Sequence, residues 1–227
     1  MPSKLPAPIP LQTAQRWSTA VLTELQKHCT RIETAGSIRR GRPQCHDIDI
    51  VCIPLTHETK DLFGATQNQT NQVLEWARGY IQRAASLPPA GVGEETPRII
   101  SGGEKPGKQL ILQLRKVQLD LWFATEKNFA SRMLCRTGSM EHNQWLALRF
   151  TERNMHWFPY EGIATLDSLR EHNITLQTHG AADKAVAAGL ILPAGTEADL
   201  YGYAGLELIP PEHRELDWLA KNIDSGL

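Results

Sequence analysis

The sequence has no long hydrophobic run, no CxxC cysteine pair and no strong excess of either charge. Its apolar runs fall far short of the roughly 18–20 residues that a membrane-spanning helix needs, so we expect no membrane segment. The first residues, 1–6, lack the apolar core of a secretion signal. Four cysteines without paired spacing are typical of reduced thiols. We therefore expect an intracellular protein in a reducing, cytoplasmic-type compartment.

The net charge of −1 excludes the uniformly basic surface of a protein that holds long nucleic acid by its phosphates. Any such contact must be local. The basic residues do gather in three clusters: Arg39, Arg40 and Arg42; Lys105, Lys108, Arg115 and Lys116; Arg132 and Arg136. Phosphate binding and ordinary solvation both remain open for them. With 41% apolar and 22% charged residues in 227, the chain can bury a core in one large or two small domains.

Apolar periodicity predicts an α+β protein. We expect helices over 12–29 and 70–85, strands over 31–35, 47–53, 98–101, 109–114 and 117–123, and a polar loop over 56–69. A short turn at Arg115-Lys116 should join the last two strands as a hairpin. After a change of composition near Glu126, helix is expected over 127–150 with a break at Thr137-Gly138-Ser139. The chain should therefore form two lobes, 1–126 and 127–227.

Asp47 and Asp49 stand two residues apart in an apolar run. Side chains alternate along a strand, so Ile48 and Ile50 should point to one face and the two carboxylates to the other. At about 3.3 Å per residue, their backbones lie about 6–7 Å apart, close enough to share metal ions. Like charges on a buried sheet are unfavourable unless cations neutralise them. The pair therefore predicts a divalent-cation site.

Asp120 is a third carboxylate, flanked by leucines in a later strand. Oxygen-only ligands suit Mg²⁺ or Mn²⁺, and two such ions about 3.5–4 Å apart can clamp the attacking and leaving oxygens of a phosphoryl transfer. We therefore expect Asp47, Asp49 and Asp120 to be the catalytic and metal-binding residues.

Gly36-Ser37 lies nine residues before the first of these carboxylates. It predicts a turn and a helix of one or two turns whose amides and hydroxyl suit a phosphate. Arg39 or Arg40 would add charge-assisted hydrogen bonds. A lone Asp-x-Asp occurs by chance in many loops, but the turn, the pair and a third strand carboxylate together are specific.

This arrangement resembles the nucleotidyltransferase superfamily, and more closely the family X DNA polymerases of the DNA polymerase beta group. The resemblance rests on three segments that span most of the chain: Gly36 to Gly41, Thr137-Gly138-Ser139 with Asn143, and residues 196–215. It implies a nucleotidyltransferase palm, a mixed β-sheet flanked by helices, over 1–126, and a small α/β thumb for the nascent base pair over 127–227. It would be a minimal palm-plus-thumb form.

The resemblance also implies roles for single residues. Asp47 and Asp49 would bridge two Mg²⁺ (or Mn²⁺) ions, while Asp120 would hold the catalytic ion and help to take the proton from the primer 3′-hydroxyl. The nucleotide would be bound by Gly36, Ser37, Arg39, Arg40, Gly138, Ser139 and Asn143, the last from the minor-groove side. The substrates would be a dNTP and a gapped or primer–template DNA, the enzyme a monomer, and the reaction short-gap DNA synthesis in repair.

Some positions depart from the family pattern. An aromatic pair stands before the Thr-Gly-Ser segment of polymerase beta, where this chain has Cys135-Arg136. We expect Arg136 to add a charge near the nucleotide phosphates or the template. The departure keeps an alternative open: a template-independent nucleotidyltransferase acting on RNA, a small molecule or a protein. A non-enzymatic nucleotide-binding or nucleic-acid-binding module is a third reading, which three carboxylates argue against.

Three further residues are candidates for nucleic-acid contact. Lys105 and Lys108 lie in a glycine-bearing basic loop and are either phosphate contacts or solvated charges. Trp145 follows Asn143 by two residues, and like the other five tryptophans it is first of all a core candidate. His142 is expected to be a packing or surface residue.

Overall fold

The structure is a computed structural model that describes residues 7–60, 66–85, 96–102 and 107–222. The chain divides into two compact units, Met1–Ala124 and Thr125–Leu227, called unit 1 and unit 2 below.

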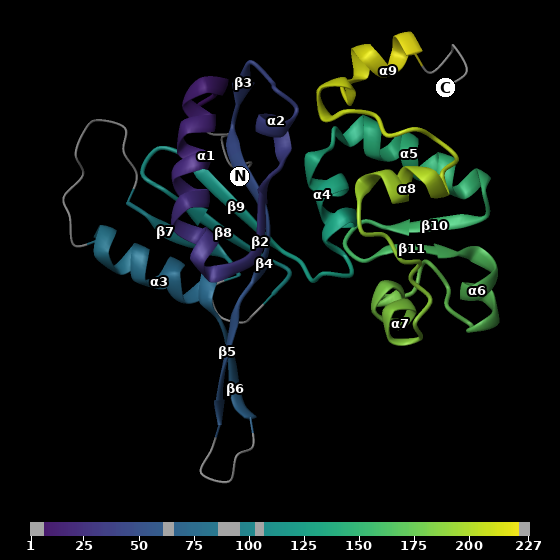
Figure 1. Cartoon of the computed structure of the whole chain (residues 1–227), viewed down its shortest axis with the longest axis horizontal. Helices are drawn as coiled ribbons and strands as arrows, with labels where there is room; N and C mark the ends of the chain where they lie inside the picture. Colours follow the sequence, from purple (N-terminus) through teal and green to yellow (C-terminus); the bar gives the residue numbers. More distant parts are fainter. Residues whose placement is uncertain (1–6, 61–65, 86–95, 103–106, 223–227) are drawn as a thin grey trace. The chain divides into compact units, whose positions relative to one another are not determined.

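A five-stranded mixed sheet forms the centre of unit 1 and confirms the expected α+β class (Figure 1). Its spatial order is β2 (Cys29–Thr34), β4 (Asp47–Pro54), β9 (Gln118–Phe123), β8 (Gln109–Gln113) and β7 (Arg98–Ser101). Only the β4–β9 pair is parallel. The hairpin expected at Arg115-Lys116 is present, closed by the hydrogen bond from Leu114 N to Val117 O at 2.9 Å.

The two long helices of unit 1, α1 (Leu11–Leu25) and α3 (Gln72–Ala85), pack on the apolar face of this sheet. Two short elements complete the unit: the 3₁₀ turn η1 (Gln26–His28) and α2 (Gly36–Arg39). The core joins Ala14 and Leu25 of α1 and Val73 of α3 to the apolar side chains of β4, β8 and β9. Asn71 begins α3, because its Oδ1 accepts hydrogen bonds from the amides of residues 73 and 74.

Two sequence predictions in unit 1 are wrong. The helix expected over 12–29 ends at Leu25, because Cys29 pairs with Pro54 and starts β2 instead. The loop expected over 56–69 contains the antiparallel pair β5 (Thr56–Lys60) and β6 (Thr66–Asn71), which extends away from the main sheet in Figure 1.

A further two-stranded pair joins β1 (Ile9–Pro10) to β3 (Gln44–Cys45).

Unit 2 consists of short helices around one hairpin. Its elements are α4 (Phe129–Thr137), α5 (Met140–Glu152), β10 (Met155–Phe158), β11 (Gly162–Thr165), α6 (Leu166–Glu171), α7 (Ala181–Ala187), α8 (Glu197–Tyr203), η2 (Pro211–His213) and α9 (Leu216–Asn222). The predicted break at Thr137-Gly138-Ser139 is confirmed between α4 and α5. A core of Leu134, Leu146, Phe150 and Trp157 with Leu200 and Tyr201 holds the helices together.

None of the described helices is both long enough and apolar enough to cross a membrane. All four cysteines are free thiols.

Candidate active site

The three predicted carboxylates lie on neighbouring parallel strands. In the register of β4 against β9, Asp49 stands directly opposite Asp120, and Asp47 is one pleat away on the same face. Ile48 and Ile50, which alternate with them along β4, are fully buried on the opposite, apolar face, as the alternation predicts. Asp47 and Asp49 are half-buried, whereas Asp120 is 8% exposed. The three carboxylates are called the carboxylate site below.

Two side chains of β9 donate hydrogen bonds to this site. Trp122 Nε1 lies 3.1 Å from Asp49 Oδ1, and Gln118 Nε2 lies 2.8 Å from Asp120 Oδ1. Sequence reasoning assigned Trp122 to the core and overlooked Gln118. The signal was present, because residues 118, 120 and 122 alternate onto one strand face. These donors fix the carboxylate orientation in the way that outer-shell partners orient metal ligands.

Gly36 lies against Asp49. Its φ of +62° is the left-handed conformation that favours glycine, and a Cβ at this position would overlap Asp49 Oδ2. The hydrogen bond from Ala35 N to Asp49 O, at 2.8 Å, holds the start of the turn to β4. The Gly-Ser turn is therefore fitted to the carboxylate strand, and only glycine permits this approach.

Ser37 follows within α2. Its Oγ is buried, and among the described residues nothing hydrogen-bonds it. A buried hydroxyl without a partner costs on the order of 1–3 kcal/mol, so this group is suited to a ligand that supplies the hydrogen bond.

Basic groups surround Asp47. Burial raises the pKa of the Asp47 carboxyl above its ordinary value, and the positive charges of His46 and Arg40 oppose part of that rise. Arg39 and Arg40 are both half-buried on and just after α2. The structure thus brings the carboxylates, the Gly-Ser turn and Arg40 into one region of unit 1.

The donor set fits a hard divalent cation, because it consists only of carboxylate oxygens. As placed, however, the side chains do not gather into a metal cluster: over the described ranges, no three His, Cys, Asp or Glu side chains are arranged to hold an ion. The strand register brings Asp49 and Asp120 side by side, while Asp49 accepts a hydrogen bond from Trp122 and Asp120 accepts one from Gln118.

The predicted residues of unit 2 gather where α4 meets α5. The peptide between Gly138 and Ser139 is cis, and Ser139 begins α5 by accepting a hydrogen bond from His142 N at 3.3 Å. Asn143 Nδ2 donates to Cys135 O at 2.8 Å, so Asn143 links α5 back to α4.

A series of side chains in mutual contact supports this turn. We call this series the thumb network. It runs from Asn143 through His142 and Tyr201 to Arg214 and Glu197. Arg214 is fully buried, and its Nη1 lies 2.7 Å from Glu197 Oε1. Its carbonyl oxygen accepts the hydrogen bond of Ser139 N at 3.2 Å. His142 is therefore a hydrogen-bonded core residue, which agrees with the packing alternative expected from the sequence.

The other predicted contact residues have different surroundings. The Arg136 guanidinium lies 5.0 Å from the ring centre of Tyr160. Trp145 is half-buried against the unit 2 core, with the Arg149 guanidinium 5.9 Å from its ring. Lys108 is exposed, and Lys105 lies outside the described residues. Nucleic-acid contact by Lys105, Lys108 and Trp145 stays a prediction.

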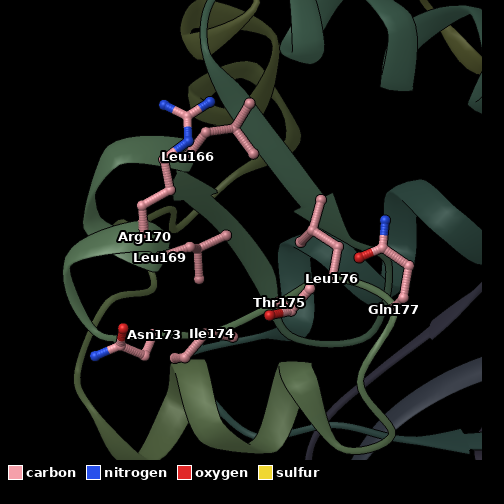
Figure 2. A pocket seen from close by; sticks show the side chains of 8 residues that line it. All are labelled: Leu166, Leu169, Arg170, Asn173, Ile174, Thr175, Leu176 and Gln177. Atoms are coloured by element: carbon pink, nitrogen blue, oxygen red, sulfur yellow. The ribbon is translucent and has the colours of Figure 1, made fainter.

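Unit 2 also contains a surface hollow of about 470 Å³ between α6 and the chain that follows it (Figure 2). Leu166, Leu169 and Arg170 line one side, and residues 173–177 line the other. Arg170 is already paired with Asp167 at 2.7 Å. None of the sequence-predicted site residues lines this hollow.

The fold defines the class: the chain has a DNA polymerase beta-like fold, as the sequence resemblance implied. Residues 132–215 match the protein-family model described as DNA polymerase beta thumb. A comparison with curated protein sequences gives no match.

Two solved structures of Leishmania infantum polymerase beta are similar to this chain. The ternary gap complex has a TM-score of 0.64 at 17% identity, over 92% of this chain and 71% of that one. The ternary P/T complex has a TM-score of 0.62 at 17% identity, over 93% of this chain and 78% of that one.

Proposed function

We propose that this chain is a metal-dependent DNA polymerase that transfers a nucleotide from a dNTP to a DNA primer 3′-hydroxyl, directed by a template, in short gaps during repair. The observation that carries the proposal is the carboxylate site, with Asp49 opposite Asp120 and the Gly36 turn closed onto Asp49. The match of residues 132–215 to a polymerase beta thumb supports DNA as the substrate. The similar solved structures are a gap complex and a P/T complex.

Asp47, Asp49 and Asp120 would hold two Mg²⁺ ions. When bound, the ions supply positive charge that stabilises the attacking and leaving oxygens of phosphoryl transfer. Trp122 and Gln118 orient two of the three carboxylates through their hydrogen bonds. Asp120, which is buried and stands opposite Asp49 in the strand register, would accept the proton of the attacking hydroxyl.

The triphosphate would be bound by the Gly-Ser turn. The buried Ser37 hydroxyl has a hydrogen bond to donate, and a phosphate oxygen accepts it. Arg40 adds a positive charge beside the carboxylates, as its effect on Asp47 indicates. Arg39 follows Ser37 within the same short helix.

The base and sugar would be bound by unit 2. Gly138 and Ser139 form the turn that begins α5, and Asn143 lies one helical turn further along. Arg136 would meet phosphates of the nucleotide or the template, with its guanidinium held over Tyr160.

Primer extension tests the proposal. The purified chain is given Mg²⁺ and all four dNTPs with either a one-nucleotide-gapped duplex, a recessed primer–template or a bare single strand. We expect addition of the nucleotide complementary to the template, with the gapped duplex as the best substrate. Untemplated addition to the single strand would replace the proposal with the template-independent alternative. No incorporation on any substrate would overturn it.

A further inference from the structure

The amide of Asn143 is held at both ends. Its Nδ2 donates to the carbonyl oxygen of Cys135 at 2.8 Å, and its Oδ1 lies 3.2 Å from Nδ1 of His142. An amide oxygen can only accept a hydrogen bond, so His142 Nδ1 must carry the proton. In the neutral ring, Nε2 is then an acceptor, and it receives the hydrogen bond of the Tyr201 hydroxyl.

The imidazole of His142 cannot turn without breaking this chain of contacts. His142 and Tyr201 are both fully buried, so no water replaces either partner. The Arg214 guanidinium lies 5.5 Å from the Tyr201 ring centre and is itself bound to Glu197 and to the Ile209 carbonyl. The position of the Tyr201 hydroxyl is therefore fixed. By donating to Nε2 of His142, it keeps the ring proton on Nδ1, which faces Asn143 Oδ1.

The consequence concerns which end of the amide remains for a ligand. The Oδ1 of Asn143 is committed to His142, and one of its two N–H groups is committed to Cys135. The side chain is half-buried and keeps its second N–H. The minor-groove edge of every base carries acceptors, N3 of purines or O2 of pyrimidines, so a fixed donor suits every incoming base. A reversed amide would present its oxygen to those acceptors and repel them.

We propose that His142 is a positioning residue that fixes the Asn143 amide with an N–H directed to the acceptor of the bound nucleotide. This rests on the proposed function, because the ligand is the nucleotide of that reaction. His142 acts only through Asn143 and does not touch the substrate.

Two variants separate positioning from packing. His142→Asn keeps an N–H near the position of Nδ1 and loses the Tyr201 contact, whereas His142→Gln keeps a polar group near Nε2 and loses the donor to Asn143. Each removes one of the two ring contacts, so both should destabilise the fold to a similar degree. For single-nucleotide insertion of dATP into a gapped duplex, we expect KM to rise about 10-fold in His142→Gln and about 2-fold in His142→Asn, with kcat little changed.

An Asn143→Ala background tests the route of the effect. In that background, adding His142→Gln should not change the KM for dATP from the value of Asn143→Ala alone. A further rise there, or equal losses in His142→Asn and His142→Gln, would overturn the proposal. Should both histidine variants fail to fold, Tyr201→Phe keeps the buried ring and removes only the hydroxyl, and it should raise KM about 3-fold.

The side-chain amide resonances of Asn143 give a readout that needs no activity. In ¹H–¹⁵N spectra of the nucleotide-free protein, the wild type and His142→Asn should share similar Asn143 amide shifts, and His142→Gln should differ. Identical Asn143 shifts in all three proteins would refute the positioning role. A wild type that inserts no nucleotide contradicts the proposed function instead, and the spectra still decide whether His142 orients the amide.

Discussion

In unit 1 the carboxylate site is placed by backbone pairing, since the parallel register of β4 and β9 alone sets Asp49 opposite Asp120. In unit 2 the position of Asn143 depends on a succession of buried side chains that reaches Tyr201 and Arg214. A site placed by backbone should keep its geometry when one side chain is lost. A site placed by side chains should be disturbed from a distance. The two units therefore predict opposite responses to substitution.

The largest effect is expected from Asp120→Asn. The substitution removes a buried negative charge while the strand register stays, so kcat should fall by roughly 10³-fold or more without loss of folding. Nucleotide affinity should change by no more than about 3-fold, because the proposed phosphate contacts, Ser37 and Arg40, are unchanged. Single-turnover primer extension and equilibrium dNTP binding measure the two quantities. Glu24→Gln, an exposed carboxylate of α1, is the matched control, and residual turnover above one tenth would contradict the assignment.

Arg214→Met tests the dependence on distant side chains. It leaves the buried Glu197 carboxylate without its cation, so the free energy of unfolding should fall by about 3–5 kcal/mol. Arg170→Met removes a comparable pair whose side chains are 68% and 65% exposed, and it should cost less than about 1 kcal/mol. Urea denaturation measures both. Equal effects of the two substitutions would show that the thumb network does not hold unit 2 together.

Gly36→Ala tests the fit between the Gly-Ser turn and Asp49. Gly36 and Gly41 have nearly the same φ, +62° and +69°, but only a Cβ at residue 36 meets a neighbour, which is Asp49. Alanine at either position strains the left-handed backbone and should lower the free energy of unfolding by about 1 kcal/mol. With the added overlap on Asp49, Gly36→Ala should lower it by about 2–3 kcal/mol in all, whereas Gly41→Ala should not. Its kcat should also fall about 10²-fold, since the carboxylate is displaced. If Gly36→Ala and Gly41→Ala had similar kcat values, the contact between the Gly-Ser turn and Asp49 would not matter for activity.

The smallest effect is expected from Asp47→Asn in metal-free protein. Because burial raises the pKa of Asp47 above its ordinary 3.8, the folded state binds this proton more tightly than the unfolded state. The resulting stability is present below 3.8 and is lost as pH rises through the folded-state pKa. At pH 8 the asparagine variant should therefore melt about 2–4 °C above the wild type, and the difference should shrink toward pH 4. A variant that melts lower than the wild type at pH 8 would contradict this sign.

Sequence patterns predicted the elements whose apolar residues alternate or repeat. Ile48 and Ile50, which alternate with the carboxylates, identified β4, and the glycine at residue 138 identified the break between α4 and α5. The β5–β6 hairpin was missed, because residues 56–60 and 66–71 are polar at every position, so that neither strand carries an apolar pattern. The end of α1 was placed too late, because Cys29 continues the helical spacing while pairing with β4 decides its conformation.

The candidate site residues also fall into two groups, those that local sequence reveals and those that depend on tertiary neighbours. Asp47, Asp49, Asp120 and Ser37 are recognisable from residue type and local spacing. The partners Trp122 and Gln118 depend on which strands become neighbours, and a parallel pairing has no local turn to reveal it. The thumb network joins residues 142, 201 and 214, and no spacing rule connects such distant positions.

The parallel pairing of β4 with β9 also has a consequence for folding. Trp122 and the carboxylate that it binds are 73 residues apart in the chain, and β5, β6, α3, β7 and β8 lie between them. The entropy of closing so long a loop is lost before the strand contacts can stabilise it, so pairing of this kind is slow. The carboxylates become neighbours only after almost all of unit 1 has been synthesised. A nascent chain that has not yet produced β9 cannot bring Asp49 and Asp120 together, and its unfinished sheet edge at β4 remains open to wrong partners.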